Sequence, residues 1–281
     1  MIDGRGWGSR ILRIYLPVIA CLVVMLFPFY WMLIASIKPN RELYNAKIMP
    51  MIVYQPTLKH YYDLFADTNF LLWTYNTMLV AVITTAISLV LGAMMAYPLA
   101  RMNFPGAAIV AIGVAATYLV PQPLLFIPMA DIINKLELGN TLRAVMLTYP
   151  TLLIPFSAWL LMGYFKSVPR ELEEAARIDG ASRFQAMWRV VLPLTTPGLL
   201  SAGIFSFTLA QNEFLYALIF LAKSDVRTVP VGVITELIRG DVFYWGQLMA
   251  AALLGSIPVA VIYSFFVDYY VAGLTAGSVK S

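Results

Sequence analysis

The stretch "ELEEAARIDGASRFQAMWRVVLP", Glu171 to Pro193, is the longest strongly polar segment in a chain of 281 residues that is otherwise mostly hydrophobic. Long apolar runs precede and follow it. Because charged side chains are costly inside a lipid bilayer, a polar segment in this position predicts a loop outside the membrane. The loop would join two membrane-spanning helices.

The residues in and around this loop predict a helix, a bend and a second helix. Ser167 is suited to cap the first helix, and Pro169 is suited to its first turn. Gly180 permits a sharp exit from that helix. Ser182 and Gln185 have the spacing of a capping box at the start of the second helix.

The first predicted helix combines a carboxylate face with a face that has almost no side-chain bulk. Ala175, Ala176 and Gly180 form the small face. A helix of this kind can be pressed into a groove on another protein, with a charge fixing its orientation. An ordinary solvated connector explains the same residues, and local physics leaves the two alternatives open.

The composition predicts a polytopic membrane protein. Hydrophobic residues make up 60% of the chain and charged residues 12%, whereas soluble domains have about 45–50% and about 25%. The net charge of +4 is explained by anionic lipid headgroups and does not indicate nucleic acid binding. Cys21 and His60 are each the only residue of their kind, which argues against a disulfide framework and most histidine-based metal chemistry.

Six apolar stretches are long enough to cross a bilayer as helices, which takes about 20 residues each. They are Ile14–Ile37, Leu71–Leu99, Ala107–Ile133, Leu142–Phe165, Thr195–Ala222 and Trp245–Val271. The first is too long for a signal peptide and has no small-residue cleavage site, so we expect it to remain as a span. The predicted fold class is therefore all-α, with six transmembrane helices.

An even number of spans places both termini on the same side of the membrane. The basic residues divide almost equally, with ten on the side of the termini and nine on the other. Their placement is more informative, since three arginines precede the first span and five basic residues lie between Lys166 and Arg189. We therefore expect both termini and the polar loop to be cytoplasmic.

A fixed spacing in the polar loop resembles a known family. Glu174-Ala175-Ala176, three residues, Gly180, nine residues, Val190, one residue and Leu192-Pro193 resemble the EAA loop of ABC importer permeases, E-A-A-x3-G-x9-I-x-L-P. Val190 in place of Ile is the single departure. The resemblance implies a coupling helix that docks into a cleft of an ATP-binding cassette ATPase. The implied docking residues are Glu174, Ala175, Ala176, Asp179, Gly180, Leu192 and Pro193.

Other segments resemble permeases of the carbohydrate-uptake branch. They are "ASIKPNRELY", "AYPLARMNFPG" and "QNEFLYALIF", the last with Gln211 where relatives often have Trp. The tail "GLTAGSVKS" is similar to the end of the second permease of maltose-type systems, which reaches into the paired ATPases. The resemblance implies contacts of this kind for Gly273, Thr275, Gly277 and Lys280, although small residues also suit a frayed terminus.

Polar residues inside predicted spans are candidates for a translocation pathway, because such residues usually face a bundle interior or a cavity. Gln211, Asn212 and Glu213 form the densest group, and Asn76 and Tyr118 are weaker candidates. Amides and carboxylates suit hydroxyl-rich solutes. Glu213 can equally be an interfacial or structural partner.

These observations predict a type I ABC importer permease of the bacterial cytoplasmic (inner) membrane. Residues 1–13 would form a cytoplasmic N-terminus, 14–271 the permease with its coupling loop at 166–193, and 272–281 a cytoplasmic tail. The resemblance implies a second permease, two ATPase copies and a periplasmic or extracellular substrate-binding protein as partners, besides membrane lipid. The solute would be a sugar or sugar-like molecule; monosaccharides, oligosaccharides, polyols and substituted sugars all fit.

The chain is not expected to be an enzyme. It has no G-x-x-x-x-G-K-[ST] phosphate-binding loop, so we expect no cofactor on this chain, with ATP and Mg²⁺ in the partner ATPase. The alternative is an ion-coupled secondary transporter of a small polar solute, for which intramembrane charged relays or internal repeats are typical. Glu213 is a single candidate for such a relay.

Overall fold

The computed structural model describes residues 11–276, and the side chains of residues 13–266. Within that range the chain is almost entirely helical, apart from one short antiparallel hairpin of β1 (Ile238–Arg239) and β2 (Val242–Phe243). The chain forms two compact units, Met1–Phe70 with Val233–Ile257, and Leu71–Gly232 with Pro258–Ser281. The all-α prediction is confirmed.

The first unit contains the first span and a segment that follows it. Its elements are η1 (Ile11–Tyr15), α2 (Leu16–Ile37), α3 (Asn40–Leu43), α4 (Lys59–Asp67), the β1–β2 hairpin and the first part of α16 (Trp245–Ala276). Polar contacts close the segment after α2. The buried Lys38 donates through Nζ to the carbonyls of Met49 and Pro50, and Glu42 accepts the backbone N–H groups of Tyr54 and Gln55.

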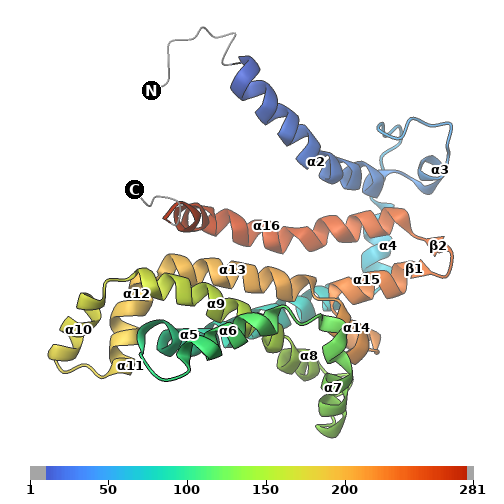
Figure 1. The fold of residues 1–281 in the computed structure, drawn as a ribbon. Coiled ribbons are helices and arrows are strands. Elements are labelled where there is room, and N and C mark those ends of the chain that lie inside the picture. Colours follow the sequence, from blue (N-terminus) through green and yellow to red (C-terminus); the bar gives the residue numbers. More distant parts are fainter. Residues whose placement is uncertain (1–10, 277–281) are drawn as a thin grey trace. The chain divides into compact units, whose positions relative to one another are not determined.

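The second unit holds the remaining helices. They are α5 (Phe70–Arg101), α6 (Ala107–Tyr118), α7 (Gln122–Lys135), α8 (Leu142–Thr148), α9 (Pro150–Ser167), α10 (Arg170–Ile178), α11 (Arg183–Ala186), η2 (Met187–Val191), α12 (Leu192–Leu194), α13 (Thr196–Asn212), α14 (Leu215–Phe220) and η3 (Ser224–Val226), followed by α15 (Val229–Leu237) at the boundary of the two units. Figure 1 shows α10 and α11 at one end of the group formed by α5, α9 and α13, and α7, α8 and α14 at the other.

Small residues let α5, α9 and α13 approach closely. A Cβ at Gly92 would lie 2.9 Å from Cβ of Ser157, and one at Gly198 would lie 2.3 Å from Cγ of Tyr164. The buried hydroxyls of Ser157 and Ser206 are hydrogen-bonded at 3.0 Å. Small residues and short polar contacts are the usual means of packing helices in a membrane, where apolar surface alone gives no net attraction.

Four helices in the described part of the chain are long and apolar enough to cross a membrane, or up to six spans if each of two bent helix pairs counts as one. The third and fifth predicted stretches are each divided into two helices. In the third, α6 and α7 meet at 95°, because Pro121 lacks the N–H group that would continue the helix. In the fifth, α13 ends at Asn212 and α14 begins at Leu215, with Glu213 in an extended conformation.

The polar loop is a helix, a bend and a second helical segment, as its residues predict. Gly180 has φ +92°, in the left-handed region that favours glycine, and the capping box of Ser182 and Gln185 is formed. The prediction for Ser167 is wrong. Its hydroxyl donates to the carbonyl of Tyr164, and α10 begins after Pro169 without a side-chain cap.

Candidate functional site

The polar loop presents an outward surface that the described part of the chain leaves exposed. Here the coupling loop means residues 166–193, which contain α10, α11, η2 and most of α12. No residue of α10 is buried. Apolar residues of the coupling loop are exposed, among them Ile178 on α10 at 87% and Phe184 on α11 at 57%. Large exposed apolar side chains on an otherwise polar segment are typical of a surface that meets another protein.

Most of the predicted docking residues lie on this surface. Glu174, Ala175, Asp179, Gly180 and Pro193 are exposed, and Ala176 is half-buried. Leu192 differs, because it is 6% exposed and packs in a buried cluster with residues of α5, α9 and α13. Leu192 therefore anchors the end of the loop in the body of the protein, whereas the other predicted docking residues are accessible on its surface.

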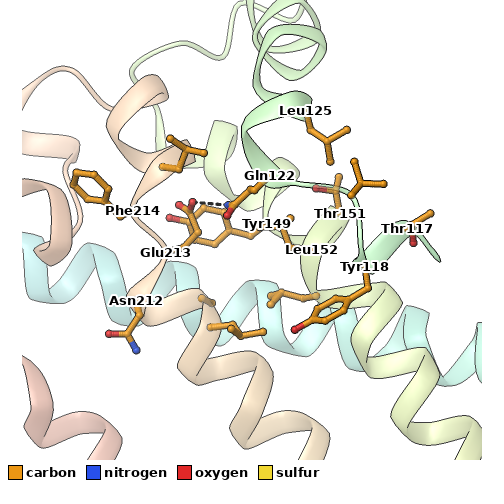
Figure 2. A pocket seen from close by; sticks show the side chains of 15 residues that line it. Thr117, Tyr118, Gln122, Leu125, Tyr149, Thr151, Leu152, Asn212, Glu213 and Phe214 are labelled. Atoms are coloured by element: carbon orange, nitrogen blue, oxygen red, sulfur yellow. Dashed lines mark hydrogen bonds between the residues drawn. The ribbon is translucent and has the colours of Figure 1, made fainter. Parts of the chain in front are cut away.

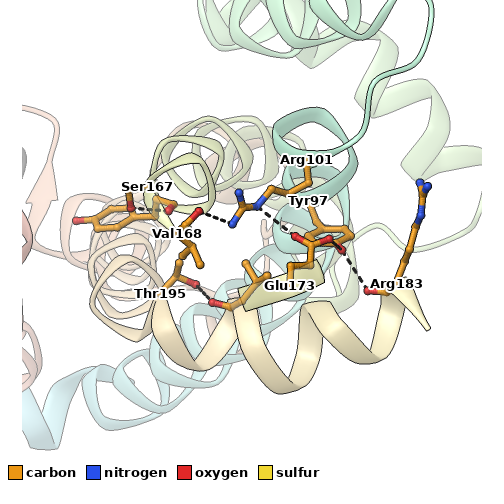
Figure 3. Close-up of polar contacts among 9 residues, drawn as sticks. Tyr97, Arg101, Ser167, Val168, Glu173, Arg183 and Thr195 are labelled. Carbon is orange, nitrogen blue, oxygen red and sulfur yellow. Dashed lines mark hydrogen bonds and ion pairs between the residues drawn. The ribbon is translucent and has the colours of Figure 1, made fainter. Parts of the chain in front are cut away.

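Glu173, next to the exposed Glu174, points the other way and joins the loop to α5. Its carboxylate accepts a hydrogen bond from the Tyr97 hydroxyl at 2.5 Å and pairs with Arg101 Nε at 3.4 Å (Figure 3). The Arg101 side chain is only 4% exposed and also donates from Nη2 to the carbonyl of Val168 at 2.7 Å. The Tyr97 hydroxyl also lies 3.2 Å from the carbonyl of Arg183.

These contacts hold the coupling loop at both of its helices. We call the group of Tyr97, Arg101 and Glu173 the inner clamp. It reaches α10 through Glu173, the segment between α9 and α10 through Val168, and the start of α11 through Arg183. An ion pair at a site this enclosed favours one geometry, since displacement leaves the buried Arg101 charge unpaired.

A second candidate site is a cavity of about 530 Å³ in the same unit, at the breaks between α6 and α7 and between α13 and α14. Its lining includes Thr117 and Tyr118 at the end of α6, Gln122 at the start of α7, and Asn212 and Glu213 at the end of α13. Figure 2 shows Gln122 and Glu213 facing each other across the two breaks. Broken helices whose ends meet at a cavity are typical of solute sites in transporters.

Glu213 is 9% exposed and is held by neutral donors. Its carboxylate accepts from Gln122 Nε2 at 2.9 Å, from the backbone N–H of Tyr216 at 2.9 Å and from that of Ala217 at 3.1 Å. The backbone donors belong to the first turn of α14, so the carboxylate satisfies N–H groups that lack helical partners. Glu213 thereby caps the start of α14 and connects this break to α7.

The other predicted pathway residues are distributed differently. Tyr118 lines the cavity and is 51% exposed, and its ring centroid lies 5.9 Å from that of Phe156. Asn212 also lines it but donates to the carbonyl of Thr208. Gln211 is buried and is not among the lining residues. Asn76 lies elsewhere, buried, with its amide donating to the carbonyls of Asp225 and Arg227.

The side chains of the four tail residues predicted to contact the ATPases are not described. Gly277 and Lys280 lie outside the described residues, and Gly273 and Thr275 lie in the last turns of α16, where only the backbone is described. Metal binding has no support in the described part of the chain, which holds no group of three His, Cys, Asp or Glu side chains suited to an ion.

Sequence reasoning missed the residues that hold both sites. Tyr97, Arg101 and Glu173 were not singled out, and neither was Gln122. One signal was present: Arg101 is a charge at the end of a long apolar run, and such a charge is expected to have a partner. Nothing local identifies that partner as Glu173, since the two residues are 72 positions apart.

Comparison with known proteins agrees with the geometry. Residues 88–275 match the family described as binding-protein-dependent transport system inner membrane component. The chain is 38% identical over 260 residues to the sulfoquinovosyl glycerol transport system permease protein SmoH of Agrobacterium fabrum, covering 92% of this chain and 90% of that protein. It is 34% identical over 275 residues to the trehalose/maltose transport system permease protein MalG of Thermococcus litoralis, covering 97% of each.

A solved structure shows the same fold. A chain of a bacterial ABC transporter involved in the import of the acidic polysaccharide alginate superimposes with a TM-score of 0.80 at 20% identity, covering 95% of this chain and 99% of that one. The matched family model covers two thirds of the sequence and includes both bent helices, the coupling loop and the cavity. This chain therefore belongs to the family of inner membrane components of binding-protein-dependent transport systems.

Proposed function

We propose that this chain is the permease subunit of an ATP-driven importer of a sugar or sugar-like solute. It would pair with a second permease, two copies of an ATP-binding cassette ATPase and a soluble substrate-binding protein. The solute class is supported by the names of two related permeases. SmoH is named for sulfoquinovosyl glycerol transport, and MalG for trehalose/maltose transport. The ATP and Mg²⁺ would be bound in the partner ATPase.

The observation that carries the proposal is the division of the coupling loop into an outward and an inward side. Glu174, Ala175 and Gly180 are exposed, while Glu173 is tied to α5 by the inner clamp. A surface of this kind suits docking because its outer face is free for a partner and its inner face is attached to a membrane-spanning helix. Closure of the paired ATPases would then move the loop and, with it, the helices around the cavity.

In the proposed topology the coupling loop and both termini would be cytoplasmic. The cavity between the helix breaks would lie on the solute's route, with Tyr118 available to stack on a sugar ring and Glu213 holding the shape of the wall. The segments Lys38 to Phe70 and Lys223 to Asp241 would face the substrate-binding protein on the outer side.

The docking surface can be tested by two substitutions on the exposed face of the loop. Glu174→Ala removes a charge that would pair with a basic residue of the ATPase, and Gly180→Trp adds bulk at a position with φ +92°. Each is expected to lower ATPase co-purification and solute uptake in sealed vesicles at least about fivefold. The matched control is Asp131→Ala, which removes an exposed carboxylate from α7. Unchanged ATP-driven uptake in the Glu174→Ala, Gly180→Trp double variant would refute the assignment.

The ion-coupled alternative is separated by the energy source. Uptake driven by ATP in sealed vesicles should survive collapse of the proton and sodium gradients with ionophores. A secondary transporter would lose uptake under the same treatment and would not need ATP.

A further inference from the structure

Helix α5 is gripped by polar contacts at both of its ends. At the end opposite the inner clamp, the indole Nε1 of Trp73 donates to the carbonyl of Ser224 at 2.7 Å. The Asn76 amide donates to the carbonyls of Asp225 and Arg227 at 3.0 Å each. We call the group of Trp73, Asn76 and Thr77 the outer clamp.

The outer clamp holds the backbone of residues 224–229 rather than its side chains. The backbone N–H of Val229 donates to Thr77 Oγ1 at 2.8 Å, at the first residue of α15. A Cβ at Gly232 would lie 2.3 Å from Cδ2 of Trp73, so the backbone of α15 rests directly on the indole ring. Trp73, Asn76 and Thr77 are all less than 5% exposed. Buried donors and acceptors satisfied in this way hold one register, since slippage leaves them unpaired.

The two clamps lie at opposite ends of α5, at residues 73–77 and 97–101. Between them α5 is a single uninterrupted helix of 32 residues, which corresponds to about 48 Å at 1.5 Å per residue. The hydrocarbon core of a bilayer is about 30 Å thick. A helix of this length carries its first turns and its last turns to the two surfaces. The third predicted span, by contrast, is bent by 95° between α6 and α7. The fifth is interrupted at Glu213, between α13 and α14.

We infer that α5 is a mechanical rod that connects the loop containing residues 224–229, on the binding-protein side, with the coupling loop on the ATPase side. The inference rests on the proposed function. A movement of either loop is passed to the same rigid helix. Side chains of α5 bind the backbone of residues 224–229 at one end, and the buried Arg101 of α5 pairs with Glu173 of the coupling loop at the other. The clamps thereby relate occupancy of the binding protein to ATP hydrolysis in the ATPase.

A contiguous set of contacts is not in itself proof of coupling, so the test measures coupling directly. The full complex is reconstituted in proteoliposomes, and ATP hydrolysis is measured with and without solute-loaded binding protein. Arg101→Met removes the charge of the inner clamp and keeps a long side chain. Asn76→Leu removes the amide of the outer clamp and keeps its size. Each should lower the stimulation ratio at least about fivefold while basal hydrolysis and ATPase co-purification persist.

The double variant distinguishes a shared path from two separate defects. Effects at residues this far apart normally add. If both clamps act through α5, Arg101→Met with Asn76→Leu should lower the stimulation ratio no further than the more severe single variant. Multiplied effects would overturn the inference. Lys135→Met is the control, since it removes a cation from an exposed i,i+4 pair on α7 and should leave the stimulation ratio unchanged.

Milder changes keep the test decisive if either variant fails to assemble. Tyr97→Phe and Thr77→Val each remove one hydroxyl and keep the shape of the side chain. If the wild-type complex is stimulated, an unchanged stimulation ratio in both variants would overturn the inference that α5 connects the two loops. A wild-type chain that binds no ATPase and shows no stimulation would instead refute the proposed function itself.

Discussion

Glu173 and Glu213 are two enclosed carboxylates in the same unit, and they are satisfied by different kinds of partner. Glu173 pairs with the cation of Arg101 and accepts from the Tyr97 hydroxyl. Glu213 accepts from one side-chain amide and two backbone N–H groups. One is an ion pair between a loop and a helix, and the other is a carboxylate held by neutral dipoles at a helix break.

The difference separates two mechanical roles. An ion pair strongly resists separation at an enclosed site, because pulling it apart leaves two unpaired charges. That suits a contact that must move as one body with the coupling loop. A carboxylate surrounded by neutral donors maintains a bend without needing a buried cation as its partner. That suits a cavity wall where a solute passes.

The largest effect is expected for Glu213→Leu. The substitution leaves the Gln122 amide and the N–H groups of Tyr216 and Ala217 without their acceptor, in a buried position. At about 1 kcal/mol or more for each donor, the free energy of unfolding should fall by about 3 kcal/mol. Denaturant unfolding of the detergent-solubilised complex, followed by tryptophan fluorescence, measures it. A loss below that of Glu213→Gln would contradict the structural role given to the carboxylate.

An intermediate effect separates the two carboxylates most sharply. Glu173→Gln leaves Arg101, with a side chain 4% exposed, without a counterion, and should cost about 2 kcal/mol of unfolding free energy. Glu213→Gln keeps an acceptor for neutral donors and should cost about 1 kcal/mol. Parallel unfolding curves of the two variants make the comparison. Equal losses, or a larger loss for Glu213→Gln, would show that the ion pair is not the distinguishing feature.

The smallest effect is expected for Gln122→Leu. It removes one of the three donors to Glu213 and leaves the two backbone donors in place. The expected loss is about 1 kcal/mol, with the bend between α6 and α7 weakened but α14 still capped. Thermal unfolding should show a lower midpoint than the wild type and a higher one than Glu213→Leu. The reverse order would mean that the hydrogen bond between Gln122 of α7 and Glu213 contributes more to stability than the cap of α14.

Local chemistry explains what was predictable in the coupling loop. Gly180 and the capping box of Ser182 and Gln185 act over three or four residues, so their pattern is visible in the sequence. Ser167 was mispredicted because a second local contact, to the carbonyl of Tyr164, competed for its hydroxyl. Short polar side chains often have several such backbone partners within reach.

The cavity was only partly predictable. Glu213 and Tyr118 stood out as polar groups in apolar runs, and both line it. Asn76 stood out for the same reason but anchors residues 224–229 at the outer clamp. Polarity inside a span indicates that a residue needs a partner, yet it does not indicate whether that partner is a solute, a cavity or another segment of the chain.

The sequence by itself determined that the chain is helical and membrane-spanning, because the length and apolarity of each run set whether it can cross the hydrocarbon core. It also determined where the coupling loop begins to bend. Only the tertiary structure decided that Glu173 rather than Glu174 faces inward and that Gln122 meets Glu213. Those features depend on contacts such as Tyr97 with Glu173, 76 positions apart, and a local pattern carries no information about a partner brought near by folding.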